Sequence, residues 1–235
     1  MLSVVDLLEA GTLDLDVAAF LMARISRGAS FMVGARPGGA GKTTVMCALL
    51  NLVPPGCELI AATPAAVRAA AHDGSPKQQC LVCHEIGAGP YFSYLWGADL
   101  RAYCALSEKD RTLATNLHAD DLDEARTQVC VENGVPAEHF NAFHVALFLR
   151  VRGGFTKERR WIEKVYVADD KGPHLLAFDK RGGTRFAATE DPAYLEQCRA
   201  FLKNALETDV RTIEATRAEV VRFLEAEGPA VGHSR

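Results

Sequence analysis

The chain has 235 residues, of which 49% are hydrophobic and 24% are charged, so it can fold around its own core and is not intrinsically disordered. Its net charge of -4 argues against a general nucleic-acid binder, which would be basic. The sequence shows neither a membrane-spanning apolar stretch nor the basic start of a signal peptide. We therefore expect a cytoplasmic protein without a membrane span, whose seven cysteines are reduced thiols.

Hydrophobic periodicity predicts helices that alternate with short apolar strands over the first part of the chain. The predicted helices are 4–9, 14–27, 42–52, 64–71, 94–106 and 121–132. The predicted strands between them are 30–34, 58–62, 79–86 and 111–117. This alternation predicts an α/β fold with a mostly parallel sheet and helices on both faces.

The pattern changes after residue 142. Residues 143–151, 160–168 and 175–178 read as consecutive strands, joined by Gly153-Gly154 and Lys171-Gly172 turns, which predicts an antiparallel extension of the sheet. Two amphipathic helices at 191–206 and 210–225 follow, and the tail 228–235 is expected to fray. We expect an α/β domain at 1–190 and a C-terminal helical extension at 191–235.

The most specific motif is Ala-Arg-Pro-Gly-Gly-Ala-Gly-Lys-Thr-Thr at 35–44, which follows a predicted strand and opens a predicted helix. This is the context of a P-loop, or Walker A motif, whose backbone N–H groups and helix N-terminus hold nucleotide phosphates. Lys42 is expected to reach the β- and γ-phosphates, and the Thr43 hydroxyl to bind Mg²⁺. The expected nucleotide-binding residues are Pro37, Gly38, Gly39, Ala40, Gly41, Lys42, Thr43 and Thr44.

One position departs from the P-loop pattern, because Arg36 stands where the first glycine is expected. Pro37 is expected to hold Arg36 extended, and a side chain is compatible with the loop if its φ is negative. The alternative is a Gly-rich turn that binds nothing. A Gly-Lys-Thr-Thr sequence between a strand and a helix favours nucleotide binding instead.

A second candidate site residue is Glu85, the acid at the end of the predicted strand 79–86. P-loop enzymes place such an acid beside Mg²⁺ or the attacking water, although a surface acid at a strand end is the alternative. The same strand carries Cys80, Cys83 and His84 in a c-type haem attachment pattern. A zinc site would need a second cysteine pair, so we expect buried thiols in a core strand.

These motifs resemble the P-loop ATPases of type II and type IV secretion and pilus systems, in particular the branch that serves tight-adherence pili. The similarity runs from about residue 13 to about residue 186. Its matching segments are the helix 18–27 before the phosphate strand, Cys57-Glu58-Leu59-Ile60 in the next strand, His84-Glu85-Ile86 at the Walker B strand, Leu117-His118-Ala119 at the histidine box, Glu124-Ala125 in the acidic helix, and 145–149 and 162–165 in the antiparallel part.

The resemblance implies a RecA-like P-loop NTPase that binds and hydrolyses ATP with Mg²⁺. It implies that Lys42, Glu85 and His118 are catalytic, with His118 near the γ-phosphate, and that Thr43 and Glu85 organise Mg²⁺. Its residue type alone favours a strand-end histidine that is hydrogen-bonded to the backbone, and the Leu-His-Ala context after Glu85 favours the functional role. The resemblance further implies a homo-oligomeric ring and partners in a secretion or pilus machine.

The sequence also departs from this family. The family has an Asp box on the strand after the first P-loop helix, but residues 60–64, Ile-Ala-Ala-Thr-Pro, carry no acid. Around Glu85, His84 stands in place of a glycine and Gly87 in place of an arginine. In the histidine box, Asn116 stands in place of a threonine. About 30 residues precede the loop, too few for the family's arginine-supplying N-terminal domain. The alternative function is therefore a hydrolysis-deficient, nucleotide-dependent binding module or regulator.

A small-molecule kinase shares the P-loop but would need an arginine-rich lid, which the antiparallel tail does not suggest. Basic residues do gather in the predicted hairpin, at Arg150, Arg152, Lys157, Arg159 and Arg160. Such a run most often marks a solvated surface. The alternatives are a partner surface or an approach to a neighbouring subunit's phosphate.

Overall fold

The computed structural model describes residues 1–74, 77–153, 159–169, 172–184, 190–208, 210 and 212–226. Its strands are β1 (Phe31–Gly34), β2 (Glu58–Ala61), β3 (Gln79–Ile86), β4 (Tyr94–Leu95), β5 (Thr112–Leu117), β6 (Val145–Arg152), β7 (Arg159–Val167), β8 (Leu175–Asp179) and β9 (Gly183–Thr184). They form one sheet in the order β2-β3-β5-β1-β6-β7-β8-β9, with β4 beside β3. The pairs from β2 to β6 are parallel and those from β6 to β9 are antiparallel. The predicted α/β fold with an antiparallel extension is confirmed.

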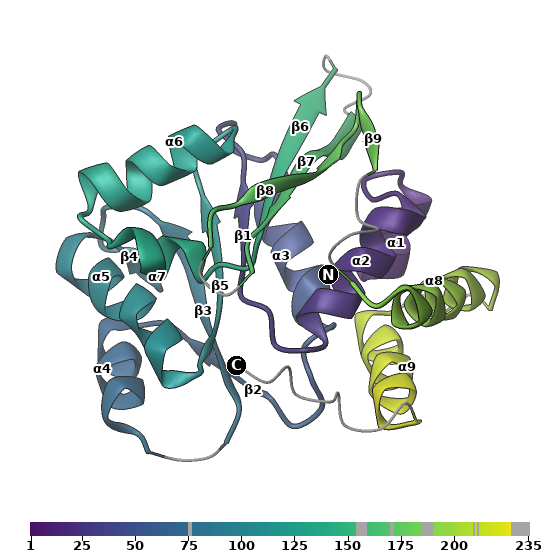
Figure 1. Ribbon diagram of the computed structural model, residues 1–235, viewed down its shortest axis with the longest axis horizontal. Helices are drawn as coiled ribbons and strands as arrows, with labels where there is room; N and C mark the ends of the chain where they lie inside the picture. The colour runs from purple at the N-terminus through teal and green to yellow at the C-terminus, as the bar shows by residue number, and fades with distance from the viewer. Residues whose placement is uncertain are drawn as a thin grey trace.

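Helices cover both faces of the sheet (Figure 1). One layer contains α1 (Val4–Glu9), α2 (Leu15–Ile25), α3 (Lys42–Leu50), α8 (Pro192–Glu207) and α9 (Ile213–Ala226), and the other contains α4 (Pro64–His72), α5 (Gly97–Ala105), α6 (Leu122–Arg126) and α7 (Ala137–Asn141). Strand β1 shows why both layers are needed. Phe31 and Val33 lie in the core of the first layer, and Met32 lies in the core of the second. A strand that is apolar on both sides is buried only between two layers.

The start of the predicted helix 94–106 is wrong. Helix α5 begins at Gly97, and the two residues before Trp96 form strand β4. Tyr94 pairs with Glu85 and Leu95 pairs with Ile86 in parallel register. The backbone of this segment is therefore used to extend the sheet beside β3, which local helix propensity does not reveal.

The predicted helix 121–132 is also only partly regular. Helix α6 ends at Arg126, and a π-helical segment, η2 (Thr127–Glu132), continues it. Gln128 Nε2 donates to the carbonyl of Ile86 at 3.0 Å, and Asn133 Nδ2 donates to the carbonyl of Gln128 at 2.7 Å.

A 3-10 turn, η1 (Leu106–Lys109), follows α5. Helix α7 and strand β9 were not predicted, and the predictions for Gly154, Lys157, Lys171 and the tail 228–235 lie outside the described residues.

The C-terminal helices pack on the layer that contains α1, α2 and α3. Cys198 and Leu202 of α8 and Val220 of α9 belong to the same core cluster as those helices. Arg217 of α9 donates to the carbonyls of Asn51, at 2.9 Å, and of Pro54, at 3.1 Å, just beyond the C-terminus of α3. A cation there compensates the free carbonyls of the helix end. In the described part of the chain, no helix is both long enough and apolar enough to cross a membrane.

Candidate functional site

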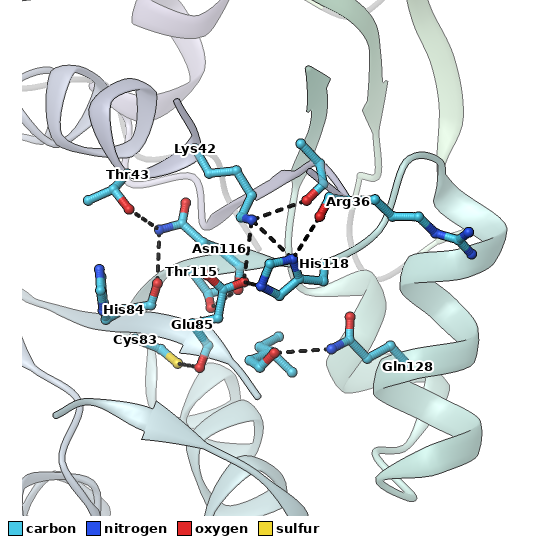
Figure 2. Close-up of polar contacts among 12 residues, drawn as sticks. Arg36, Lys42, Thr43, Cys83, His84, Glu85, Thr115, Asn116, His118 and Gln128 are labelled. Atoms are coloured by element: carbon cyan, nitrogen blue, oxygen red, sulfur yellow. Dashed lines mark hydrogen bonds and ion pairs between the residues drawn. The ribbon is translucent and has the colours of Figure 1, made fainter. Parts of the chain in front are cut away.

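The predicted site residues meet at one edge of the sheet. Strands β3, β5 and β1 are neighbours and run parallel. The loop 35–41 follows β1, His118 follows β5, and Glu85 is the penultimate residue of β3. Because the carboxyl ends of parallel strands share an edge, which is where open α/β sheets bind ligands, these segments converge (Figure 2).

Two glycines give the loop 35–41 a backbone that other residues rarely adopt. Gly39 and Gly41 have φ values of 76° and 96°, a region that favours glycine. Pro37 closes a turn by accepting a hydrogen bond from the Ala40 N–H at 3.3 Å. Gly41 then directly precedes α3, whose first turn carries no acid, so the free N–H groups and the dipole of this nine-residue helix favour an anion.

Lys42 is a nearly buried cation, with only 8% of its side chain exposed. Its Nζ donates to the carbonyl of Ala35 at 3.1 Å and lies 3.3 Å from Nδ1 of His118 and 3.8 Å from Oε1 of Glu85. Burial lowers the pKa of Lys42 below its usual value, and the negative charge of Glu85 opposes part of that shift. Lys42 therefore sits where additional negative charge would stabilise its protonated form.

Glu85 is 6% exposed, and its Oε1 accepts no hydrogen bond from the described part of the chain. Besides Lys42, it has His118 Nε2 at 3.5 Å. A buried carboxylate oxygen without a hydrogen bond is costly, so this oxygen has room for one more donor or a cation. Three of the predicted site residues, Lys42, Glu85 and His118, are thus brought together.

The residues fit Mg²⁺ only in combination with phosphate oxygens. Thr43 is exposed in the first turn of α3, and its Oγ1 lies 3.5 Å from Nδ2 of Asn116. Within the described residues, no group of three His, Cys, Asp or Glu side chains could hold a metal ion. Mg²⁺ commonly takes one or two protein ligands, and water and nucleotide phosphates complete its shell. The Thr43 hydroxyl at the start of α3 suits such a shell, whereas Oε1 of Glu85 lies nearest Lys42 and His118, so the role of Glu85 as a second ligand stays a prediction.

A cavity of about 270 Å³ lies beside the first turns of α3. It is lined by Thr43, Thr44, Cys47, Met1 and Leu2. This cavity extends the loop surface along the outer side of the helix, where Thr44 is half-buried.

Arg36 does not enter the loop. Its φ is not positive, as the extended backbone before Pro37 predicted. Its N–H donates to Asp120 Oδ1 at 2.9 Å, and its guanidinium forms an ion pair with Glu124 Oε1 at 2.7 Å. Figure 2 shows the side chain pointing away from Lys42 toward α6. The Arg36 side chain, which stands in place of the first glycine, therefore does not obstruct the loop.

Arginines of the β6–β7 hairpin lie beside the loop, which the sequence did not reveal. Nη2 of Arg160 donates to the carbonyl of Gly39 at 3.3 Å, and the Arg160 chain runs 3.3 Å from where a Cβ on Gly41 would lie. Arg150 forms an ion pair with Asp120 at 3.2 Å. Both side chains are exposed, and each also makes a polar contact with the loop or with Asp120. The run of basic residues was the only sequence signal for them.

The cysteine pair of β3 does not form a joint ligand site. Cys80 lies in the core cluster on one face of the sheet, and Cys83 lies in the cluster on the other face. Burial raises the pKa of Cys83 to about 12. Side chains three residues apart in a strand point to opposite faces. These two thiols therefore cannot bind one haem or coordinate one zinc ion together.

The sequence matches no known family model and no curated protein. The fold resembles the ATPase DotB of Yersinia pseudotuberculosis, with a TM-score of 0.50 and 7% identity over 92% of this chain and 62% of that one. Weaker likenesses are the Legionella pneumophila ATPase DotB, with a TM-score of 0.49 and 11% identity over 94% and 62% of the two chains, and the VirB11 ATPase of the Brucella suis type IV secretion system in complex with sulphate, with a TM-score of 0.47 and 19% identity over 68% and 53%. The chain thus spans less than two thirds of each of these proteins, and the likeness to Yersinia DotB supports the fold alone.

Proposed function

We propose that this protein binds ATP with Mg²⁺ at residues 37–44, the loop and the start of α3, and hydrolyses it. The observation that carries this proposal is the convergence of Lys42, Glu85 and His118 on the end of a Gly-rich loop. Their polar atoms lie 3.3 to 3.8 Å apart at the carboxyl ends of three adjacent strands. The fold likeness to the ATPase DotB is consistent with it.

Each residue has a role that follows from its position. The loop N–H groups and the α3 N-terminus bind the phosphates, and Lys42 neutralises charge on the β- and γ-phosphates. Oε1 of Glu85, which accepts no hydrogen bond from the described residues, orients the attacking water and accepts its proton. His118, half-exposed beside Glu85, contacts the γ-phosphate. Bound through Thr43 and phosphate oxygens, Mg²⁺ would neutralise charge that develops in the transition state.

The cavity beside Thr43 and Thr44 continues from the phosphate-binding end of α3. We assign it to the ribose and base of the nucleotide. Its walls are mostly apolar side chains together with the two threonines, which suits a flat ring better than a second phosphate.

The wider role is proposed from the sequence motifs and the fold. We infer a cytoplasmic relative of the secretion and pilus ATPases, of the tight-adherence type, that assembles as a homo-oligomer and drives or regulates such a machine. The division into an ATPase domain at 1–190 and a helical extension at 191–235 belongs to the same proposal.

The test is ATP turnover measured with Mg²⁺ over a range of protein concentrations. Turnover per subunit that rises with concentration would support an ATPase that assembles to work. A constant, non-zero value would support hydrolysis and reject the oligomeric requirement. Absence of turnover despite ATP binding would reject hydrolysis and leave a nucleotide-dependent binding module.

A further inference from the structure

Asn116 occupies the centre of the site but has no part in the roles assigned above. It lies on β5, the strand between β1 and β3, and is 0% exposed. Its Nδ2 donates to the carbonyl of His84 at 2.8 Å and lies 3.5 Å from Oγ1 of Thr43. One side chain therefore links the first turn of α3 to the end of β3, as Figure 2 shows.

The orientation of this amide is forced by its partners. The carbonyl of His84 can only accept, so the amide nitrogen must face it. Oδ1 then points away from that carbonyl and has no hydrogen-bond partner among the described residues. A fully buried amide oxygen without a donor is costly, which suggests that a donor arrives when the site is loaded.

The hydrogen bond from Asn116 acts on the peptide unit that joins His84 to Glu85. The carbonyl of His84 belongs to the planar peptide unit that includes the N–H and Cα of Glu85. Holding that carbonyl therefore fixes the direction in which the Glu85 side chain leaves the strand. The second hydrogen of the same amide is available to the hydroxyl oxygen of Thr43, the proposed cation ligand.

We propose that Asn116 is a positioning residue that couples the cation at Thr43 to the placement of Glu85. The inference rests on the proposed function, because it assumes that Thr43 binds Mg²⁺ with the nucleotide. A water molecule on the bound cation would supply the donor that Oδ1 lacks. A threonine at this position has one hydroxyl group with a single hydrogen, so it cannot donate to both Thr43 and the carbonyl of His84 while it accepts from a water.

The experiment measures the affinity of the full chain for a fluorescent, non-hydrolysable ATP analogue, with EDTA and with saturating Mg²⁺. The wild type is expected to bind more tightly with Mg²⁺. In Asn116→Leu, which keeps the volume and removes the amide, the affinity in EDTA stays within about twofold of the wild type, but the gain from Mg²⁺ falls about tenfold. The control Thr112→Val removes a hydrogen bond to Gly28 at the far end of the same strand and keeps the gain.

An unchanged gain from Mg²⁺ in Asn116→Leu would overturn the inference, and so would an equal loss of affinity in both conditions, which indicates a merely structural role. If circular dichroism shows that Asn116→Leu is unfolded, Asn116→Thr replaces it, with the same reduced gain expected. If the wild type binds no analogue in either condition, the proposed function itself is refuted. If the wild type binds more tightly with Mg²⁺ and Asn116→Leu does so equally, only the inference about Asn116 is refuted.

Discussion

Nζ of Lys42 lies 3.8 Å from Oε1 of Glu85, and both side chains are less than a tenth exposed. The pair is incomplete, since the Glu85 oxygen accepts no hydrogen bond from the described residues and burial disfavours the charged form of Lys42. Buried ion pairs repay their desolvation only when other polar groups complete them. A polyphosphate with its cation would complete both partners.

Replacing Glu85 by glutamine separates hydrolysis from binding. The amide has almost the shape of the carboxylate but cannot take a proton from water, so ATP turnover is expected to fall at least about 100-fold. The affinity for Mg·ATP should stay within about threefold, because the loop and Lys42 are intact. Steady-state turnover and calorimetry measure the two effects. The exposed Glu132→Gln is the matched control, and turnover retained in Glu85→Gln would remove Glu85 from the chemistry.

Arg160 is predicted to strengthen phosphate binding from the β6–β7 hairpin. Arg160→Ala removes a cation that contacts the carbonyl of Gly39, and the affinity for ATP should fall about five- to tenfold, with a weaker dependence on salt. Arg152→Ala removes the same charge one register position further along the hairpin and should have little effect. Equal losses in both variants would show a general charge effect.

Restoring the missing glycine of the loop is expected to bring no benefit. Arg36→Gly loses an exposed ion pair with Glu124, worth at most about 1 kcal/mol, and adds backbone freedom to the unfolded chain. The melting temperature should fall by a few degrees at most, and the ATP affinity should change less than about twofold. An affinity gain of tenfold or more would mean that Arg36 does obstruct the loop.

As the pH is raised, the affinity for ATP should begin to fall at a lower pH than it would if Lys42 had the pKa of an ordinary lysine. Burial lowers the pKa of Lys42, and bound phosphates raise it again. Binding therefore takes up a proton once the pH exceeds the lowered pKa, and the affinity declines as pH rises through that value. Lys42→Arg keeps its charge at these pH values, so it should show a flatter profile in titrations from about pH 7 to about pH 10. A wild-type profile that is flat to pH 10 would contradict the assignment.

Local rules predicted the alternating strands and helices, the Gly-rich loop and Glu85, and the family resemblance added His118. The Gly-rich loop, Glu85 and His118 each follow an apolar strand, and parallel strands place such positions at one edge. The contacts of Arg160 and Asp120 with the loop could not be predicted in this way. They depend on the placement of the β6–β7 hairpin and of the segment before α6, which sequence periodicity does not encode.

The role of Asn116 shows the same limit. The sequence marked this residue only as a departure from a family pattern. Its contacts follow from the place of β5 between β1 and β3, from which one amide reaches the carbonyl of His84 on β3 and the hydroxyl of Thr43 in α3. The pairing of β4 with β3 was likewise not predicted, because a strand of two residues, Tyr94 and Leu95, is too short to show an alternating pattern.

The most direct test of the central claim is calorimetric binding of Mg·ATP to the full chain and to Lys42→Ala. The account predicts saturable binding to the wild type and a loss of at least about tenfold in Lys42→Ala, since one charge-assisted contact to phosphate is removed. Circular dichroism controls for folding of the variant. No binding to the folded wild type, or equal affinity of a folded Lys42→Ala, would contradict the assignment of this loop as a nucleotide site.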